Sequence, residues 1–168
     1  YYASPQNWNY EKYMPELYTL QNRGYCLGFH DGKLTNISQN YEYTRTLGDW
    51  LFAGSIVKWD GDDAVFEVRN YINGGEFIEF LIPGTLDNLR LTLTEFEDAF
   101  SGEITPRVSA GQGKKIRIRP QMWNRPVSEI KKLLPQYAIA RKPAPLQGEN
   151  AEMLCHKKTE FRQLCHKE

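Results

Sequence analysis

The sequence predicts a mainly β fold, an antiparallel barrel or sandwich of short strands. Aromatic residues, which favour strands, make up 13% of the 168 residues. From Arg23 to Pro120 the chain divides into β-type runs separated by turn residues at intervals of roughly 8 to 12 residues, a spacing typical of such folds. Hydrophobic residues make up 40% of the chain, which excludes the composition of a disordered protein.

Six strands are expected, in residues 24–30, 50–59, 64–70, 76–82, 89–94 and 114–119. Turn-forming residues stand between them, at Asp60-Gly61, Asn73-Gly74-Gly75, Pro83-Gly84, Ser101-Gly102 and Gly111-Gln112-Gly113. Alternation in two of the strands predicts which side chains enter the core: Leu89, Leu91, Leu93, Ile116 and Ile118. The same alternation places Lys115, Arg117 and Arg119 together on one exposed face.

The two ends of the chain differ from the β region. We expect residues 1–22 to be a linker, 23–120 the barrel, 121–142 a basic helical or extended segment, and 143–168 a linker and helical tail. Pro15-Glu16-Leu17 is predicted to open a short helix, and Ser128 to cap a helical turn that Pro135 ends. Residues 151–166 are predicted to form an amphipathic helix whose apolar stripe packs on a neighbouring surface.

Charge is unevenly distributed along a chain whose net charge is zero. Residues 60–106 carry eleven acidic and two basic side chains, whereas residues 107–142 carry ten basic and one acidic side chain. Such asymmetry can steer a polyanion toward one part of the surface. Alternatively, the two segments pair with each other in the fold.

No motif for nucleotide binding, nucleophilic catalysis or metalloprotease chemistry occurs in the sequence, so we expect the chain to be catalytically silent. Gly111-Gln112-Gly113-Lys114 superficially resembles a phosphate loop, but it precedes a strand and is predicted to be a hairpin turn. With no apolar run approaching the roughly 20 residues that span a bilayer, we expect a cytoplasmic protein with no membrane partner.

Soft metal ligands lie in two places, Cys26 with His30, and Cys155-His156 with Cys165-His166. Ten residues of helix span about 15 Å, too far for both tail pairs to bind one ion unless the tail bends or two chains meet. The expectation is an amphipathic helix with no metal, with zinc binding and redox pairing as alternatives. Cys26 is expected to be a small buried apolar residue.

The run Asn22-Arg23-Gly24-Tyr25-Cys26-Leu27-Gly28-Phe29 resembles the motif that opens the C-terminal domain of the collagenase-like U32 peptidase family. The family-motif residues are Arg23, Gly24, Tyr25, Gly28 and Phe29. Further matches follow in order, in residues 52–57, 68–70 and 75–83, and Tyr1-Tyr2-Ala3 resembles the end of the family's catalytic domain.

This resemblance implies a closed antiparallel β-barrel, similar to translation-factor barrels, with short helices at its ends. It also implies that residues 1–22 are a linker from an upstream (β/α)-barrel catalytic domain, the partner of this chain. In the family's tRNA hydroxylases that domain carries an iron–sulfur cluster. No cofactor is expected in this chain. The expected function is non-catalytic, with the domain positioning RNA, specifically tRNA, for a hydroxylating partner. The alternatives are a peptidase-associated domain for protein binding or oligomerisation, and a barrel that only shields the catalytic domain.

Basic residues in and after the last expected strand are the candidate RNA-binding side chains, because contacts to phosphates give affinity for RNA. They are Lys114, Lys115, Arg117, Arg119, Arg125, Lys131 and Lys132. Trp123 and Tyr137 are the candidates for stacking on unpaired bases, with burial in the core as the alternative for both.

Overall fold

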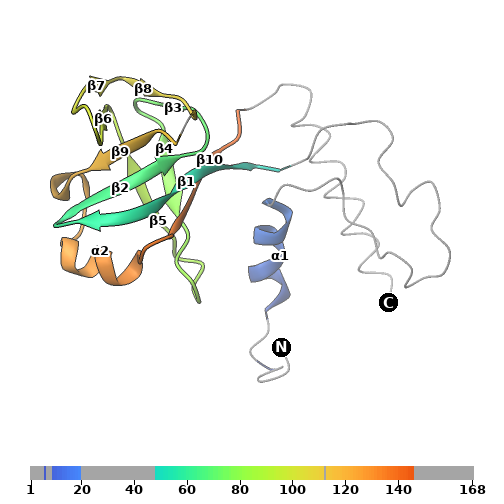
Figure 1. Ribbon diagram of the computed structural model, residues 1–168. Coiled ribbons are helices and arrows are strands. Elements are labelled where there is room, and N and C mark those ends of the chain that lie inside the picture. The colour runs from blue at the N-terminus through green and yellow to red at the C-terminus, as the bar shows by residue number, and fades with distance from the viewer. Residues whose placement is uncertain (1–5, 7–8, 20–47, 112, 146–168) are drawn as a thin grey trace. The chain divides into compact units, whose positions relative to one another are not determined.

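The computed structural model describes residues 6, 9–19, 48–111 and 113–145. The chain divides into two compact units, one of Leu51–Pro143 and one that combines Tyr1–Trp50 with Ala144–Glu168. The elements drawn in Figure 1 are, in chain order, α1 (Tyr10–Thr19), β1 (Trp50–Asp60), β2 (Asp63–Val68), β3 (Ile72–Asn73), β4 (Phe77–Phe80), β5 (Leu89–Thr92), β6 (Phe96–Asp98), β7 (Ile104–Thr105), β8 (Arg107–Val108), β9 (Lys115–Ile118), the 3-10 helix η3 (Pro120–Met122), α2 (Val127–Leu133) and β10 (Ile139–Pro143).

Helix α1 begins earlier than the sequence predicted, because Asn9 rather than Pro15 marks its start. The Asn9 side-chain oxygen accepts a hydrogen bond of 3.0 Å from the backbone N–H of Lys12, which satisfies a donor in the first turn. Pro15 lies inside the helix. The family-motif residues in 22–29, the expected strand 24–30 and the expected helix 151–166 lie outside the described residues.

One curled antiparallel sheet dominates the larger unit (Figure 1). Its strand order is β5-β4-β10-β1-β2-β9-β6-β7, and β3 pairs separately with β8. The hairpin turns expected at Asp60-Gly61 and Pro83-Gly84 are present, since β1 pairs with β2 and β4 with β5. The structure therefore confirms a mainly β fold in which the sheet curls into a half-barrel, and closure of the barrel stays a prediction.

The core lies on the inner face of this sheet. All five predicted core residues are buried, from Leu89 and Leu91 at 5% exposure to Ile118 at 0%. Phe80 forms the centre of an aromatic cluster, with its ring 5.8 Å from that of Phe66 and 5.6 Å from that of Trp123. Trp123 is 7% exposed, so it belongs to the core and not to a stacking surface.

Two local predictions are wrong in detail. The strands before and after Gly111-Gln112-Gly113-Lys114 do not form the expected hairpin, because β8 pairs with β3 whereas β9 pairs with β2 and β6. Ser128 is the second residue of α2 and not its cap, which is Pro126. The proline ring fixes a φ from which a helix can start. Its missing N–H costs nothing there, because the first residues of a helix donate no hydrogen bond within the helix. The helix does end before Pro135, as expected.

None of the helices in the described ranges is both long enough and apolar enough to cross a membrane.

Candidate functional site

The candidate site lies on the outer face of strands β1, β2 and β9. The register pairs Lys58 with Val65 across β1 and β2, and pairs Val65 with Arg117 across β2 and β9. Because side chains alternate along a strand, the inward Ile116 and Ile118 place Lys115 and Arg117 on this outer face. The cationic face predicted from the sequence is therefore confirmed for these two residues.

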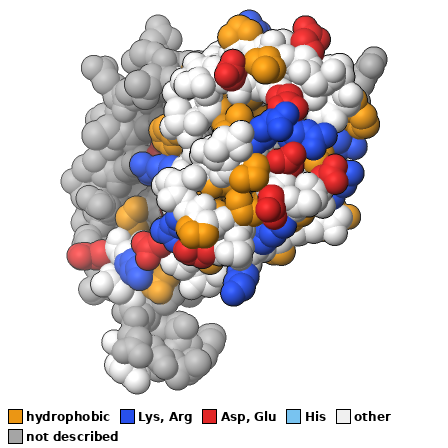
Figure 2. Space-filling view, turned by 90° about the vertical axis from the view of Figure 1, so that its left-hand side faces the viewer, with side chains coloured by type: hydrophobic (Ala, Val, Ile, Leu, Met, Phe, Trp, Pro, Cys, Tyr) orange, Lys and Arg blue, Asp and Glu red, His pale blue; other side chains and the backbone are white. Residues whose placement is uncertain are grey.

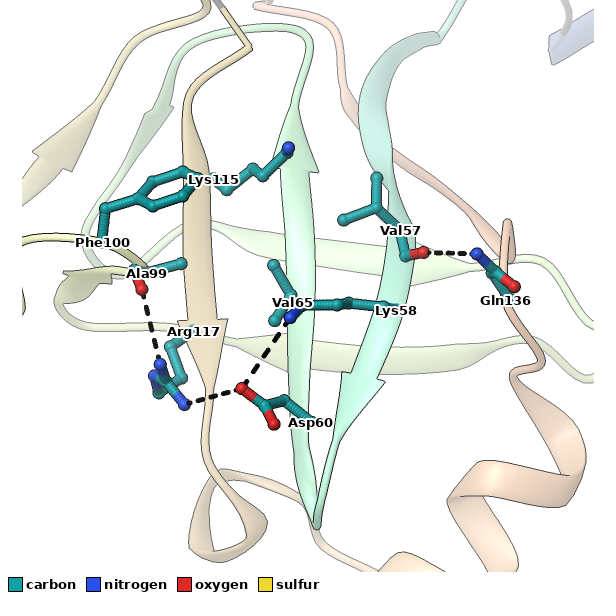
Figure 3. Close-up of a pocket in the computed structure, with 9 residues that line it drawn as sticks. All are labelled: Val57, Lys58, Asp60, Val65, Ala99, Phe100, Lys115, Arg117 and Gln136. Carbon is teal, nitrogen blue, oxygen red and sulfur yellow. Dashed lines mark hydrogen bonds and ion pairs between the residues drawn. The ribbon is translucent and has the colours of Figure 1, made fainter.

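An open groove of about 440 Å³ occupies this face (Figure 3). Its floor is Val65, which points away from the core and is still only 3% exposed. The long charged side chains around Val65 shield it with their methylene groups, while their charged ends stay in water. The residues that line the groove are Val57, Lys58, Asp60, Val65, Ala99, Phe100, Lys115, Arg117 and Gln136.

Phe100 forms the wall of the groove on the β9 side and is 82% exposed. Its loop is fixed by Asp98, whose Oδ1 accepts hydrogen bonds from the backbone N–H groups of Phe100 (2.8 Å) and Ser101 (2.9 Å). The Lys114 ammonium, 2.5 Å from Asp98, and these two N–H groups hold the pKa of the Asp98 carboxyl well below its usual range. Gly102, with φ 71, completes the turn in a conformation that favours glycine. The backbone that carries the exposed ring is thus fixed by hydrogen bonds to Asp98.

The opposite wall of the groove is built on an irregularity in β1. The pairing with β2 shifts between Ile56 and Lys58, which leaves Val57 as an extra residue, as in a β-bulge. The Gln136 side chain donates a 2.8 Å hydrogen bond to the Val57 carbonyl oxygen freed there. The bulge therefore anchors the loop between α2 and β10 at the edge of the groove.

Most of the predicted RNA-binding bases are paired with carboxylates. Lys114 pairs with Asp98 at 2.5 Å, Arg117 with Asp63 at 3.0 Å, Arg119 with Glu97 at 2.6 Å, Arg125 with Glu129 at 2.9 Å and Lys131 with Asp62 at 2.7 Å. Figure 2 shows blue and red side chains next to one another on the surface instead of in separate patches. The acidic and basic segments thus pair with each other, the second of the two readings that the sequence left open.

Lys115 and Lys132 differ from the other five predicted bases. In the part of the chain that the structure describes, neither ammonium forms an ion pair with a carboxylate. Lys115 instead lies over the Phe100 ring, with its Nζ 5.7 Å from the ring centre, and lines the groove. Lys132 is exposed on α2 and does not line it. The seven predicted bases therefore do not form one site.

A second ionic cluster is buried and structural. Glu79 accepts hydrogen bonds from Arg141 at 2.8 Å and from Arg90 at 2.9 Å, so that β4 is bound to both of its neighbours, β10 and β5. Burial raises the pKa of Glu79, but these two guanidinium groups outweigh burial and lower the pKa overall. Lys142 is 2% exposed and lies 2.6 Å from Glu76.

Two residues in segments that resemble the family motifs, Glu79 and Gly54, have structural roles. Glu79 belongs to the cluster just described, in the matched segment 75–83. Gly54 lies in the matched segment 52–57, and a Cβ on it would come within 2.0 Å of the Glu67 carbonyl oxygen. Both residues are thus explained by packing and hydrogen bonding, without any ligand.

Metal ligands do not converge in the described ranges, where no group of three or more His, Cys, Asp or Glu side chains could hold an ion. Cys26, His30 and the two Cys-His pairs of the tail lie outside these ranges. The expectation that the chain binds no metal therefore stays a prediction.

Three residues that line the groove were not predicted from the sequence, namely Phe100, Lys58 and Gln136. One signal for Phe100 was present, since it directly precedes the expected Ser101-Gly102 turn, and a turn tip places side chains in solvent. Gln136 carries no such signal, because its position depends on a hydrogen bond to a residue 79 positions away. Of the two predicted stacking residues, Tyr137 is 67% exposed and Trp123 is buried.

No protein-family model matches the chain, and no curated protein matches it significantly. Two similar solved structures are the C-terminal domain of a U32 peptidase assigned in Geobacillus thermoleovorans and its selenomethionine variant. They are 22% and 21% identical to this chain, cover 54% and 55% of it, and are themselves covered to 90% and 99%, each with a TM-score of 0.41. Both come from the family that the sequence motifs resemble.

Proposed function

We propose that this chain is a non-catalytic module that holds a single-stranded segment of RNA in the groove on the outer face of β1, β2 and β9. The observation that carries the proposal is the pair formed by Lys115 and Phe100, a cation beside an exposed ring. Proteins that bind single strands combine cations for the phosphates with aromatic rings on which bases stack. The exposed Phe100 ring, on a loop whose backbone is bound to Asp98, offers such a stacking surface.

The charge balance inside the groove also supports an anionic ligand. Three cations, Lys58, Lys115 and Arg117, line the groove together with one carboxylate, Asp60. Since Arg117 is already paired with Asp63 at 3.0 Å, Lys58 and Lys115 are the cations left for a ligand. The Lys58 ammonium is 4.0 Å from Asp60 and largely exposed, and exposed pairs of this kind contribute only about 0–1 kcal/mol. A phosphate can therefore replace the carboxylate as the partner of Lys58 at little cost in free energy.

The motif resemblance supplies the biological context of the proposal. A U32-type parent protein would place a catalytic domain before this module, and the RNA would be the substrate of that domain. Loops and ends of tRNA expose unpaired bases, which is where proteins commonly recognise RNA. In this proposal the module contributes binding free energy and orientation, and the chemistry belongs to the other domain.

The test is a titration of fluorescein-labelled single-stranded oligouridine, about 12 nucleotides long, monitored by anisotropy at several salt concentrations. Lys115→Gln is expected to weaken binding several-fold and to flatten the log–log salt dependence by about 0.7, the value for one phosphate on a single strand. Lys132→Gln removes the same charge outside the groove and is the matched control. It should bind like the wild type.

Two outcomes contradict the proposal. One is the absence of wild-type binding at about 50 mM salt, where contacts to phosphates are strong. The other is equal binding of oligouridine and oligoglutamate, both of them lost in Lys115→Gln. That result would assign the groove to acidic protein segments, because oligoglutamate carries charge without bases.

A further inference from the structure

Tyr137 has a backbone conformation that tyrosine rarely adopts. Its φ is 69°, and no other non-glycine residue that the structure describes has a positive φ. The left-handed region is strained for an ordinary L-residue because of its Cβ, whereas glycine enters it freely. A residue that persists there is held by its surroundings, and such positions cluster at functional sites.

The surroundings of Tyr137 do hold it. Its N–H donates a 2.7 Å hydrogen bond to the carbonyl oxygen of Ile56, and the N–H of Ile56 donates in return to Ala138 at 3.0 Å. The neighbouring Gln136 is anchored on Val57. The loop is thus fastened to the irregular part of β1, directly beside the groove.

The fold uses the backbone of Tyr137 but not its ring. The side chain is 67% exposed, and a glycine would form the same turn without strain. Neither the backbone conformation nor core packing therefore accounts for a large aromatic ring at this position. The tyrosine ring has the shape and the rigidity that stacking requires.

We propose that Tyr137 is a second stacking platform for the single strand whose first base lies on Phe100, an inference that rests on the proposed function. In Figure 3, Phe100 and Gln136 border the groove at opposite ends, with β9, β2 and β1 between them. Two interstrand spacings, about 10 Å, separate β9 from β1, a distance that a short oligonucleotide spans. The strand therefore runs across the β-strands, with its phosphates over Lys115 and Lys58.

The test compares Tyr137→Gly, Tyr137→Phe and Phe100→Ala in the oligouridine titration, together with thermal melts. Tyr137→Gly is expected to weaken binding by at least about fivefold, the low end for loss of one stacked base, and to melt at or above the wild-type temperature. Tyr137→Phe keeps the ring and should retain most of the affinity. Ile104→Ala removes an exposed apolar side chain outside the groove and is the control for Phe100→Ala.

The outcomes separate the two proposals. Wild-type affinity in Tyr137→Gly, together with weakened binding in Phe100→Ala, would overturn the second platform and leave the RNA function standing. A wild-type protein that does not bind oligouridine would overturn the function itself. Loss of affinity in Tyr137→Phe equal to that in Tyr137→Gly would also contradict stacking, because it would assign the effect to the hydroxyl group.

Discussion

Glu79 shows how a single buried residue organises the sheet. Its carboxylate, 5% exposed, lies 2.6 Å from Arg141 and 2.9 Å from Arg90, which come from the strands on either side. The sequence predicted a strand at residues 76–82 from its apolar and turn residues. It did not predict the burial of Glu79, because the partner Arg141 is 62 positions away and no local pattern links the two.

Replacing Glu79 by Gln is expected to lower the free energy of unfolding by about 3–5 kcal/mol. The Arg141 side chain, 9% exposed, would lose the charge of the Glu79 carboxylate 2.6 Å away, and breaking a buried pair has a cost of this order. Urea unfolding followed by circular dichroism measures the difference. Glu103→Gln, at an exposed position, is the control, and a loss in Glu79→Gln no larger than in this control would refute the assignment.

Acid is expected to destabilise the larger unit through Glu76 and Glu79. Burial raises the pKa of each carboxyl, but hydrogen bonds from Lys142 to Glu76 and from Arg90 to Glu79 outweigh burial, so each pKa is lowered on folding. Groups of this kind stabilise the fold above their unfolded pKa of about 4.3, and the stabilisation is lost as pH falls through the lower folded value. The melting temperature should therefore fall as pH drops below about 4, and less steeply in Glu79→Gln than in wild type.

At the scale of elements, the sequence predicts local pairing and not the long-range insertions. Hairpins such as β1–β2 follow from a turn of suitable residues between alternating strands. The insertion of β10 between β4 and β1 brings together residues far apart in the chain, and turn chemistry does not encode it. The same limit applies to the site. The cations on β9 were predicted from the sequence, but the position of Gln136 at the edge of the groove was not.

The loop from Asp98 to Glu103 is expected to matter for both binding and stability. Asp98→Ala removes the acceptor for two backbone N–H groups at the base of Phe100, and with it the hydrogen bonds that fix the backbone carrying the ring. We expect weaker oligouridine binding and a lower melting temperature, since the Asp98 side chain is 12% exposed and its ion pair with Lys114 is lost as well. Glu103→Ala removes the same negative charge from an exposed position of this loop, and the loss of a negative charge by itself favours an anionic ligand. Oligouridine binding by Asp98→Ala as tight as by Glu103→Ala would contradict a role for the fixed loop.

At the scale of the whole molecule, most of the acidic and basic side chains behind the charge asymmetry of the sequence form ion pairs with each other in the fold. Residues 107–142 supply the bases and residues 60–106 the acids, and strand pairing brings β9 against β2 and β6, where both kinds meet. The sequence showed the asymmetry but not its use, because which charges meet depends on the pairing of distant strands. Of the seven predicted bases, Lys115 in the groove and Lys132 on α2 are the two that form no ion pair in the described residues.

Two double variants distinguish structural from free cations. Arg117→Gln with Arg119→Gln removes the partners of Asp63 and Glu97, whereas Lys115→Gln with Lys132→Gln removes two charges that form no ion pair in the described chain. We expect the first variant to melt at a lower temperature than the second. Equal melting temperatures would show that the ion pairs of β9 contribute nothing to stability.

The most direct test of the RNA-binding groove is to map chemical shifts of backbone amides while single-stranded oligouridine is added to the ¹⁵N-labelled chain. Our account predicts that the largest shifts occur at Lys58, Val65, Phe100 and Lys115 and in the loop at Gln136 and Tyr137, with α2 unaffected. Shifts confined to α2 or to the edge strand β5, or no shifts at all, would contradict it.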